Sequence, residues 1–285
     1  MPLRTDCSVE LSMPASPDLA RVERALDHLA PGVPVVGLTD NHAGRARLSP
    51  LAAIPACVRR GVRPVVHLSC RDRNWLAVRQ QVLGAAALGA SGILVVRGDE
   101  VPGQRVPGVA VAEVLRQIPE WVAPRPVWRG AVVNPFADPV RELRLLERKV
   151  AAGIDFLQTQ MVFDPDRLDS FLAAAAGIVP PEVPIFASLG LLRTERMLRF
   201  VRTRLPDCPI PPALTRRIEA GEGRAVALEL AAAIGSRPAV RLHVIPLGAE
   251  AEVRRVIRAF RAARRASRAG DLPPAAGGPG PGSGA

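Results

Sequence analysis

Residues 91–100 read SGILVVRGDE, and this stretch decides the fold class. Its apolar run, residues 93–96, is too short for a helix and stops abruptly at Arg97-Gly98-Asp99. A short apolar run next to Gly is typical of a parallel strand that is buried on both faces. Because α/β proteins place their chemistry at the carboxyl ends of such strands, Asp99 is predicted to lie at a functional site.

Similar runs recur along the chain and alternate with helical patterns. The predicted strands cover residues 7–11, 34–38, 64–68, 93–96, 130–133, 154–160, 184–187 and 240–244. Among the predicted helices are one capped by Ser49 and others over residues 139–152, 194–204, 211–234 and 252–265. Eight strand and helix pairs in 285 residues predict a (β/α)8 TIM barrel. A doubly wound open sheet is the alternative, since it shows the same alternation.

The chain is predicted to form one domain followed by a tail. Residues 1–268 hold all the strand and helix patterns and are assigned to the barrel. Residues 269–285 consist largely of Gly and Pro, which cannot bury enough apolar surface to fold, so a disordered tail is expected there.

The formal charge of +11 first suggests a nucleic-acid partner. However, 38 residues are basic and Lys149 is the only lysine among them, which indicates a compositional bias towards Arg. Tyr is absent and aromatic residues make up 4% of the chain, so few platforms exist for stacking bases. We therefore predict no nucleic-acid partner, although a basic surface suits a small anionic substrate. The basic side chains of the last helix, Arg254, Arg255, Arg258, Arg261, Arg264 and Arg265, are predicted to form a solvated face.

The cysteines and apolar runs point to a soluble cytoplasmic protein without a metal centre. Cys7, Cys57, Cys70 and Cys208 are scattered, with no pairing typical of zinc sites, and are expected to be reduced. No apolar run approaches the roughly 20 residues of a membrane span, and no signal peptide is recognisable. We therefore expect no membrane association.

Polar residues stand at or near the ends of the predicted strands. They are Glu10, Asp40, His67, Asp99, Asn134, Gln160 and Ser188. In a barrel these side chains meet on one face, and carboxylates, an imidazole and amides around an apolar well predict an enzyme site. Taken singly, each has a structural interpretation, since a strand-end Asp can cap a helix and a Gln can bond loop backbone.

Four segments carry a family resemblance. In chain order they are LTDNHAGRARLSPLA, VVHLSCRDRNWLAVRQQVLGAAALGASGILVVRGDE, VVNP and KVAAGIDFLQTQMVFD. Together they resemble the methylenetetrahydrofolate reductase family over roughly residues 5–260. The resemblance implies a (β/α)8 barrel that binds FAD and reduces methylenetetrahydrofolate to methyltetrahydrofolate.

The resemblance also implies catalytic and substrate-binding residues. Glu10 resembles the glutamate that protonates N10 of the folate, and its apolar neighbours are expected to raise its pKa. Asp99 resembles the family's aspartate beside the flavin and the pterin. Gln160 resembles the family's amide that forms hydrogen bonds with the pterin or the nicotinamide. In the segment SLGLLRTERM, Glu195 stands near the position where the family offers an aromatic ring to the folate.

For the cofactor, the resemblance implies contacts around the isoalloxazine ring, the ribityl chain and the phosphates. The corresponding residues are Thr39, His67, Val96, Arg97, Gly98 and Asn134, with Glu142 and Lys149 matching adenosine and phosphate contacts more loosely. No GxGxxG turn is present, so the flavin is not expected on a Rossmann turn.

The expected function is therefore flavin-dependent reduction of 5,10-methylenetetrahydrofolate to 5-methyltetrahydrofolate, with NADH or NADPH as donor. Two alternatives stay open: a catalytically lapsed folate- or flavin-binding subunit of a redox complex, and a folate reductase that works without flavin. The sequence leaves the assembly open between a homo-oligomer and a complex with a partner redox subunit.

Overall fold

Eight parallel strands close into a barrel in the computed structural model, which describes residues 5–270 except 30, 100–105, 107 and 206. The strands are β1 (Cys7–Leu11), β2 (Val35–Leu38), β3 (Arg63–Ser69), β4 (Gly92–Val96), β5 (Trp128–Val133), β6 (Phe156–Met161), β7 (Ile185–Gly190) and β8 (Val240–Ile245). Strand β1 pairs with β2 through Val9 and Val36 and with β8 through Cys7 and Leu242. Because β1 has a neighbour on each side, the sheet has no edge, and the predicted TIM barrel is confirmed over the open sheet.

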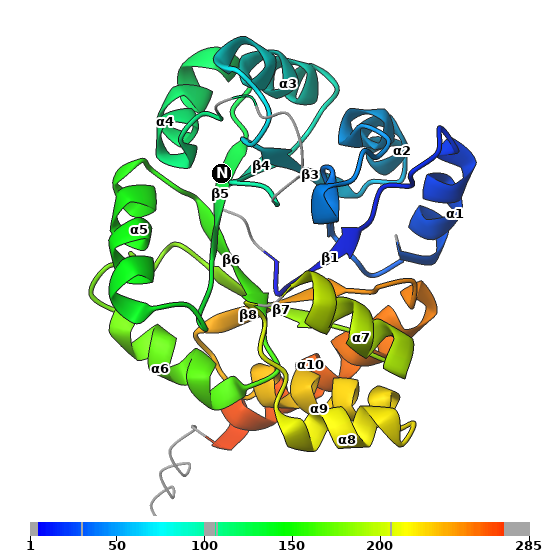
Figure 1. The fold of residues 1–285 in the computed structure, drawn as a ribbon. Helices are drawn as coiled ribbons and strands as arrows, with labels where there is room; N and C mark the ends of the chain where they lie inside the picture. Colours follow the sequence, from blue (N-terminus) through cyan, green and yellow to red (C-terminus); the bar gives the residue numbers. More distant parts are fainter. Residues whose placement is uncertain (1–4, 30, 100–105, 107, 206, 271–285) are drawn as a thin grey trace, which may run out of the picture.

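Helices surround the strands (Figure 1). They are α1 (Leu19–Leu29), α2 (Ile54–Arg59), α3 (Trp75–Ala87), α4 (Val111–Val122), α5 (Pro139–Ala151), α6 (Pro165–Ala175), α7 (Glu195–Arg204), α8 (Pro212–Glu219), α9 (Gly223–Gly235) and α10 (Val253–Gly270). Short 3-10 helices cover His42–Gly44, Pro50–Ala53 and Glu250–Glu252. Helix α10 buries an apolar stripe against the barrel, formed by Val253, Val256, Ile257 and Phe260.

The barrel interior is a packed core below the carboxyl ends of the strands. Five buried side chains fill it: Val35, Val65, Leu94, Phe156 and Phe186. The two Phe rings meet edge to face, with centroids 6.1 Å apart. A Cβ on Gly130 would collide with the Phe156 ring, so a glycine at position 130 leaves the space that this ring occupies.

Two helix predictions need correction. Residues 211–234 form two helices, α8 and α9, which are separated at Gly221 with φ 87°. That backbone conformation favours Gly and ends the first helix. The helix capped by Ser49 begins as a 3-10 helix, Pro50–Ala53, before α2. Helix α10 extends to Gly270, two residues past the expected barrel boundary, and residues 271–285 of the predicted tail lie outside the described residues.

The basic face predicted for the last helix is partly wrong, because several of its arginines have partners on the barrel. Arg261 donates to both carboxylate oxygens of Asp6, at 2.7 and 2.9 Å. Arg255 pairs with Glu252, and Arg264 donates to the backbone carbonyls of Arg237 and Val240. Arg261 and Arg264 thus bind α10 to the amino-terminal ends of β1 and β8, whereas the pair of Arg255 with Glu252 is local to the start of the helix.

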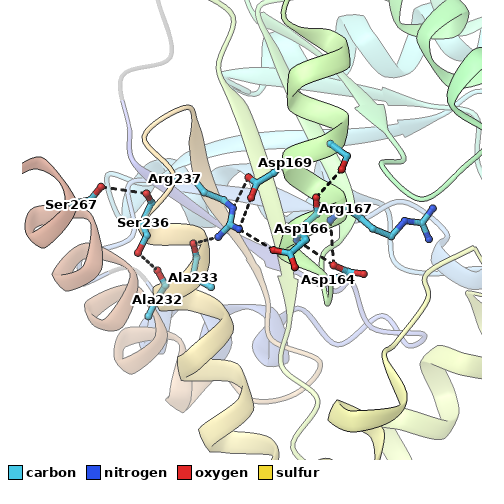
Figure 2. A network of polar contacts seen from close by, with 10 residues as sticks. Asp164, Asp166, Arg167, Asp169, Ala232, Ala233, Ser236, Arg237 and Ser267 are labelled. Carbon is cyan, nitrogen blue, oxygen red and sulfur yellow. Dashed lines mark hydrogen bonds and ion pairs between the residues drawn. The ribbon is translucent and has the colours of Figure 1, made fainter. Parts of the chain in front are cut away.

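A second polar network joins α6, α9 and α10 (Figure 2). Arg237 follows α9 and donates to both carboxylate oxygens of Asp169 on α6, at 2.7 and 2.6 Å, with Asp166 3.8 Å away. Ser267 on α10 donates to the Ser236 carbonyl at 3.3 Å. The network fixes the helices that follow β6, β7 and β8 relative to one another.

The prediction that the cysteines are free thiols is confirmed. All four cysteines are buried and free, and burial raises the pKa of Cys57, Cys70 and Cys208 to about 12. At neutral pH these three are therefore protonated thiols. Within the described residues, no helix combines the length and apolarity that crossing a membrane needs.

Candidate active site

A cavity of about 420 Å³ opens at the carboxyl ends of the strands. Every residue that the sequence pointed to as catalytic, substrate-binding or cofactor-binding lines it: Glu10, Thr39, His67, Val96, Arg97, Gly98, Asp99, Asn134, Glu142, Lys149 and Gln160. These residues lie on strands β1, β3, β4 and β6, in the turns that follow β2, β4 and β5, and on helix α5, so positions as far apart in the chain as Glu10 and Gln160 meet here. The convergence is thus observed, and the individual roles stay predictions. No cluster of His, Cys, Asp and Glu suited to a metal ion occurs among the described residues.

Glu10 lies deep in this cavity, on the inner face of β1. Its side chain is 15% exposed, and its Oε2 atom lies 3.8 Å from Nε2 of His243 on β8. His67 on β3 and His42 in the 3-10 helix after β2 are the other imidazoles whose charge acts on it. Sequence reasoning missed His243, although its place on the eighth predicted strand was available as a signal.

The raised pKa expected for Glu10 is not found. Desolvation by burial raises the pKa of this carboxyl, but the neighbouring imidazoles of His243, His67 and His42 lower it by more. The net result is a pKa below the ordinary value of 4.5. Glu10 in the open cavity is therefore a carboxylate at neutral pH.

His67 is held neutral by its surroundings. Burial lowers its pKa from 6.5 to about 4, although Glu10 and Asp40 act in the opposite direction. Its Nε2 atom is buried and has no hydrogen-bond partner among the described residues. A neutral imidazole can either donate or accept at that atom, as a ligand requires.

This shift of the His67 pKa makes folding stability depend on pH. Between pH 6.5 and about 4 the unfolded chain protonates His67 and the folded chain does not, so the free energy of unfolding falls as the pH falls. The loss due to His67 is about 3 kcal/mol once the pH reaches 4. Urea unfolding of wild type and His67→Gln should show the variant gaining about this much relative to wild type between pH 7 and 4. A difference that is constant with pH would contradict the assignment.

Asp40 at the end of β2 has a structural role. Its side chain is 4% exposed and forms a bidentate ion pair with Arg73, one of whose contacts measures 3.0 Å. It also accepts the backbone N–H of Ser69 at 2.9 Å, and Arg73 donates to the Ser69 carbonyl at 2.8 Å. The pair joins the end of β2 to the turn after β3, so Asp40 shapes the cavity wall.

Thr39 organises the turn beside Asp40. Its hydroxyl oxygen accepts the backbone N–H of Met13 at 3.0 Å and lies 3.3 Å from Nδ1 of His42. Burial and the positive charge of Arg47 lower the pKa of His42, so this imidazole is neutral at pH 7. The hydroxyl therefore fixes the ends of β1 and β2 and the His42 ring together.

Asn134, Glu142 and Lys149 form one connected network. Glu142 accepts the backbone N–H of Asn134 at 3.1 Å and lies 3.5 Å from Lys149 Nζ, which donates to the Val132 carbonyl at 2.7 Å. Burial lowers the pKa of Lys149, and Glu142 partly offsets this shift. The Asn134 amide donates to the Asp207 carbonyl at 3.2 Å and so connects β5 to the segment after α7.

Gln160 lies on β6 and Gly98 follows β4, and these two strands flank β5. The Gln160 amide oxygen accepts the N–H of Met161 at 2.9 Å, which leaves the amide NH2 as the group that can donate to a ligand. Gly98 has φ 91°, and a Cβ there would collide with Ser69, so the Arg97-Gly98-Asp99 turn requires Gly.

Helix α7 contributes two residues that the sequence prediction missed. Phe200 is 43% exposed and lines the cavity together with Arg204. Glu195 does not line the cavity and instead pairs with Arg199 one turn away, at 2.9 Å. The expectation that Glu195 replaces an aromatic ring is therefore wrong, because the helical turn after it brings Phe200 to the opening. The sequence did contain a signal for this residue, because Phe200 is an aromatic residue about one and a half turns into the predicted helix 194–204.

A second cavity of about 680 Å³ continues the first between the ends of β3, β4 and β5 and helices α4 and α5. The two share Arg97, Val132 and Lys149 in their linings. Arg71 and Arg148 add further cationic side chains, and the remaining wall is mostly apolar. An elongated ligand with a ring at one end and anionic groups in the middle fits such a pair of cavities.

Comparison with known proteins decides the family. The profile of the methylenetetrahydrofolate reductase family matches residues 6–258, which include every strand and every cavity residue named above. The chain belongs to the methylenetetrahydrofolate reductase family. The predicted resemblance is thereby confirmed.

Two curated relatives in this family are eukaryotic. Methylenetetrahydrofolate reductase 2 of Schizosaccharomyces pombe is 25% identical over 188 residues, which are 59% of this chain and 28% of the relative. A probable methylenetetrahydrofolate reductase (NADPH) of Caenorhabditis elegans is 25% identical over 160 residues, or 52% of this chain and 24% of the relative. The chain thus matches about a quarter of the length of each relative.

Among solved structures, a Clostridium thermocellum protein that binds two copies of 5-methyl-5,6,7,8-tetrahydrofolic acid has the same fold. The TM-score is 0.64 at 11% identity, and the match covers 91% of this chain and 95% of that protein. At this identity the likeness shows the barrel fold alone.

Proposed function

We propose that the chain reduces 5,10-methylenetetrahydrofolate to 5-methyltetrahydrofolate with FAD as cofactor and NADH or NADPH as electron donor. The observation that carries the proposal is the position of Glu10. It is a carboxylate buried among imidazoles at the bottom of a cavity whose rim offers Asp99, Gln160 and Phe200. This arrangement provides a carboxyl group, two hydrogen-bonding groups and a flat apolar surface for one heteroaromatic ligand, and a ligand that excludes water would raise the pKa of that carboxyl so that it can carry a proton.

The chain's own residues fit FAD. The two connected cavities have room for an elongated dinucleotide. Arg97 and Lys149 line both cavities, so their positive charges lie where the phosphate groups of such a ligand would be. The orphaned Nε2 of His67 and the backbone of Gly98, close to Ser69, offer polar contacts to a flavin ring. When bound, FAD supplies the two-electron chemistry that connects the nicotinamide with the folate.

Glu10, Asp99 and Gln160 would then bind and protonate the substrate. Glu10 protonates N10 of the folate, which opens the imidazolidine ring, and Asp99 accepts hydrogen bonds from the pterin. Gln160 donates its NH2 group to the pterin or to the nicotinamide, since its oxygen is already engaged by Met161. Arg204 at the opening provides a positive charge for the carboxylates of the glutamate tail.

Phe200 should matter for substrate affinity. A partly exposed ring at the cavity opening can stack on the planar part of the substrate, which contributes about 1 kcal/mol. We expect Phe200→Leu to raise the KM for methylenetetrahydrofolate about fivefold, and Phe200→Tyr to keep it near the wild-type value. Steady-state kinetics of both variants measures this, and equal KM values for Leu and Phe at this position would contradict stacking.

The visible spectrum of the purified protein tests the proposed function most directly. Flavin absorbance peaks are expected, with bleaching by NADH or NADPH under anaerobic conditions and recovery on addition of methylenetetrahydrofolate. A colourless protein that still reduces folate would instead identify the flavin-free reductase. Flavin that neither donor reduces would identify the lapsed subunit, which works with a partner redox protein.

A further inference from the structure

A third cavity, of about 1380 Å³, lies at the amino-terminal ends of the strands, on the face of the barrel opposite the candidate active site. Its lining includes the first residues of β3 and β5, Arg63 and Trp128, and the second residue of β8, Arg241. Within the part of the chain that the structure describes, it shares no lining residue with the other two cavities. The packed layer that contains Phe156 and Phe186 lies between.

Strand geometry turns Arg63, Trp128 and Arg241 towards the inside of the barrel. Arg63 is two positions before Val65, a member of the packed inner layer, and side chains two positions apart lie on one face of a strand. Trp128 packs directly against this layer. Arg241 is the register partner of Phe186, another member of it. Two positive charges therefore point into the amino-terminal mouth of the barrel.

Aromatic rings hold both guanidinium groups in place. The Cζ atom of Arg63 lies 5.3 Å from the centroid of the Trp128 ring, and the Cζ atom of Arg241 lies 5.7 Å from that of Phe186. A guanidinium group over a ring keeps its N–H donors along its edge, where they can bind a carboxylate through two parallel hydrogen bonds. The rings thus preorganise these side chains for an anion.

The charge of Arg63 is not compensated by a carboxylate. Its Nε atom donates to the Pro34 carbonyl at 3.4 Å, and it forms no ion pair with any residue that the structure describes. Both terminal NH2 groups of Arg63 are therefore available to a ligand. The third arginine of the cavity, Arg129, is by contrast engaged by Asp155, whose Oδ2 atom lies 3.3 Å from Arg129 Nε.

Arg241 has lost part of its hydration. Burial lowers its pKa, and the charge of Asp6 partly offsets this shift. Asp6 is itself bound by Arg261 through both carboxylate oxygens, at 2.7 and 2.9 Å. The other carboxylate in the lining besides that of Asp155 belongs to Glu182, which is exposed. An anion inside the cavity would compensate the hydration that Arg241 loses.

The rest of the wall is largely apolar and rigid. It contains four prolines, Pro119, Pro124, Pro126 and Pro180. Valine side chains from α4, α5 and the segments before β5 and β7 complete it. Because the backbone dihedral of proline is fixed, a ligand that packs against this wall orders little additional chain. Such a wall beside two arginines suits a ligand with a flat apolar body and a negative charge.

We propose that this cavity is a second ligand site, which binds an organic anion made of an aromatic ring and a carboxylate. The carboxylate accepts hydrogen bonds from Arg63 and Arg241, and the ring packs against Trp128 and the proline wall. An inorganic anion lacks the apolar part and a neutral aromatic compound lacks the charge, so both should bind much more weakly. The inference is independent of the reaction proposed for the opposite face of the barrel.

Indole N–H signals in NMR spectra of the whole chain locate such a ligand. Of the three tryptophans, Trp128 lines this cavity, whereas Trp75 on α3 lies outside all three linings. With the Trp128 signal assigned by Trp128→Phe, 2-naphthoate should shift it with a Kd below about 1 mM and leave the Trp75 signal unchanged. The neutral analogue 2-naphthamide and inorganic phosphate should each bind at least about tenfold more weakly. An unmoved Trp128 signal, or an equal affinity for either control compound, would overturn the proposal.

Matched variants separate this site from the cavities on the other face. Arg63→Gln should weaken 2-naphthoate binding at least about tenfold, because a charge-assisted hydrogen bond is lost. Arg63→Lys keeps the charge without the planar fork and should weaken binding less. Arg148→Gln makes the same change in the cavity beside α5 and should leave the titration unchanged. Loss of the response in Arg148→Gln together with its retention in Arg63→Gln would overturn the proposal, and the wild-type titrations decide it even if a variant does not fold.

Discussion

Replacing Glu10 by Gln should abolish reduction of methylenetetrahydrofolate while leaving reduction of the bound flavin by NADH or NADPH within about twofold of wild type. Gln has the size and hydrogen-bonding reach of Glu but no proton to give. General acid catalysis typically contributes factors of about 10² to 10⁴, and the folate half-reaction should lose at least that much. Stopped-flow spectroscopy of the two half-reactions measures the effect.

Glu195→Gln serves as the matched control. Glu195 is 62% exposed, lies outside the cavity and pairs with Arg199, so its substitution should change neither half-reaction. Equal losses in both half-reactions of Glu10→Gln would mean that the carboxylate supports the cavity and does not protonate the substrate.

Arg73→Ala should destabilise the fold more than any other single arginine substitution on the barrel top. The variant would leave Asp40 buried, with its side chain 4% exposed and its charge uncompensated. Removing one partner of a buried ion pair costs about 3–5 kcal/mol. Urea unfolding should show this loss in the free energy of unfolding, with an unchanged dependence on denaturant concentration.

Two comparisons isolate the cause. Arg199→Ala breaks an exposed pair with Glu195, with side chains 72% and 62% exposed, and should cost at most about 0.5 kcal/mol. The double variant Asp40→Asn/Arg73→Ala should recover part of the loss, since no buried charge is left without a partner. A loss for Arg73→Ala no larger than for Arg199→Ala would contradict the role assigned to this pair.

The sequence by itself determined the barrel and the composition of its site. Each strand is a short apolar run, and the strand order follows from alternation with helices, so periodicity and chain length were sufficient to predict β1 to β8. The positions of Glu10, Asp99 and Gln160 at strand ends were sufficient to predict that they converge. Local patterns are enough to predict these features. A strand that is buried on both faces appears as a continuous apolar run, and alternation of such runs with helices is typical of parallel strands.

The tertiary structure alone decided the electrostatics of the site. The lowered pKa of Glu10 depends on His67 and His243, and His243 is bound to Ser8 across 235 positions of the chain. Likewise, Arg261 donates a hydrogen bond to Asp6, which lies 255 positions earlier in the chain. This contact binds to the barrel a face of the last helix that was predicted to be solvated. Charge interactions act through space over a few ångströms, whereas sequence patterns report only the burial of neighbouring residues. Which imidazole faces which carboxylate is therefore fixed only when the barrel closes and brings β8 next to β1.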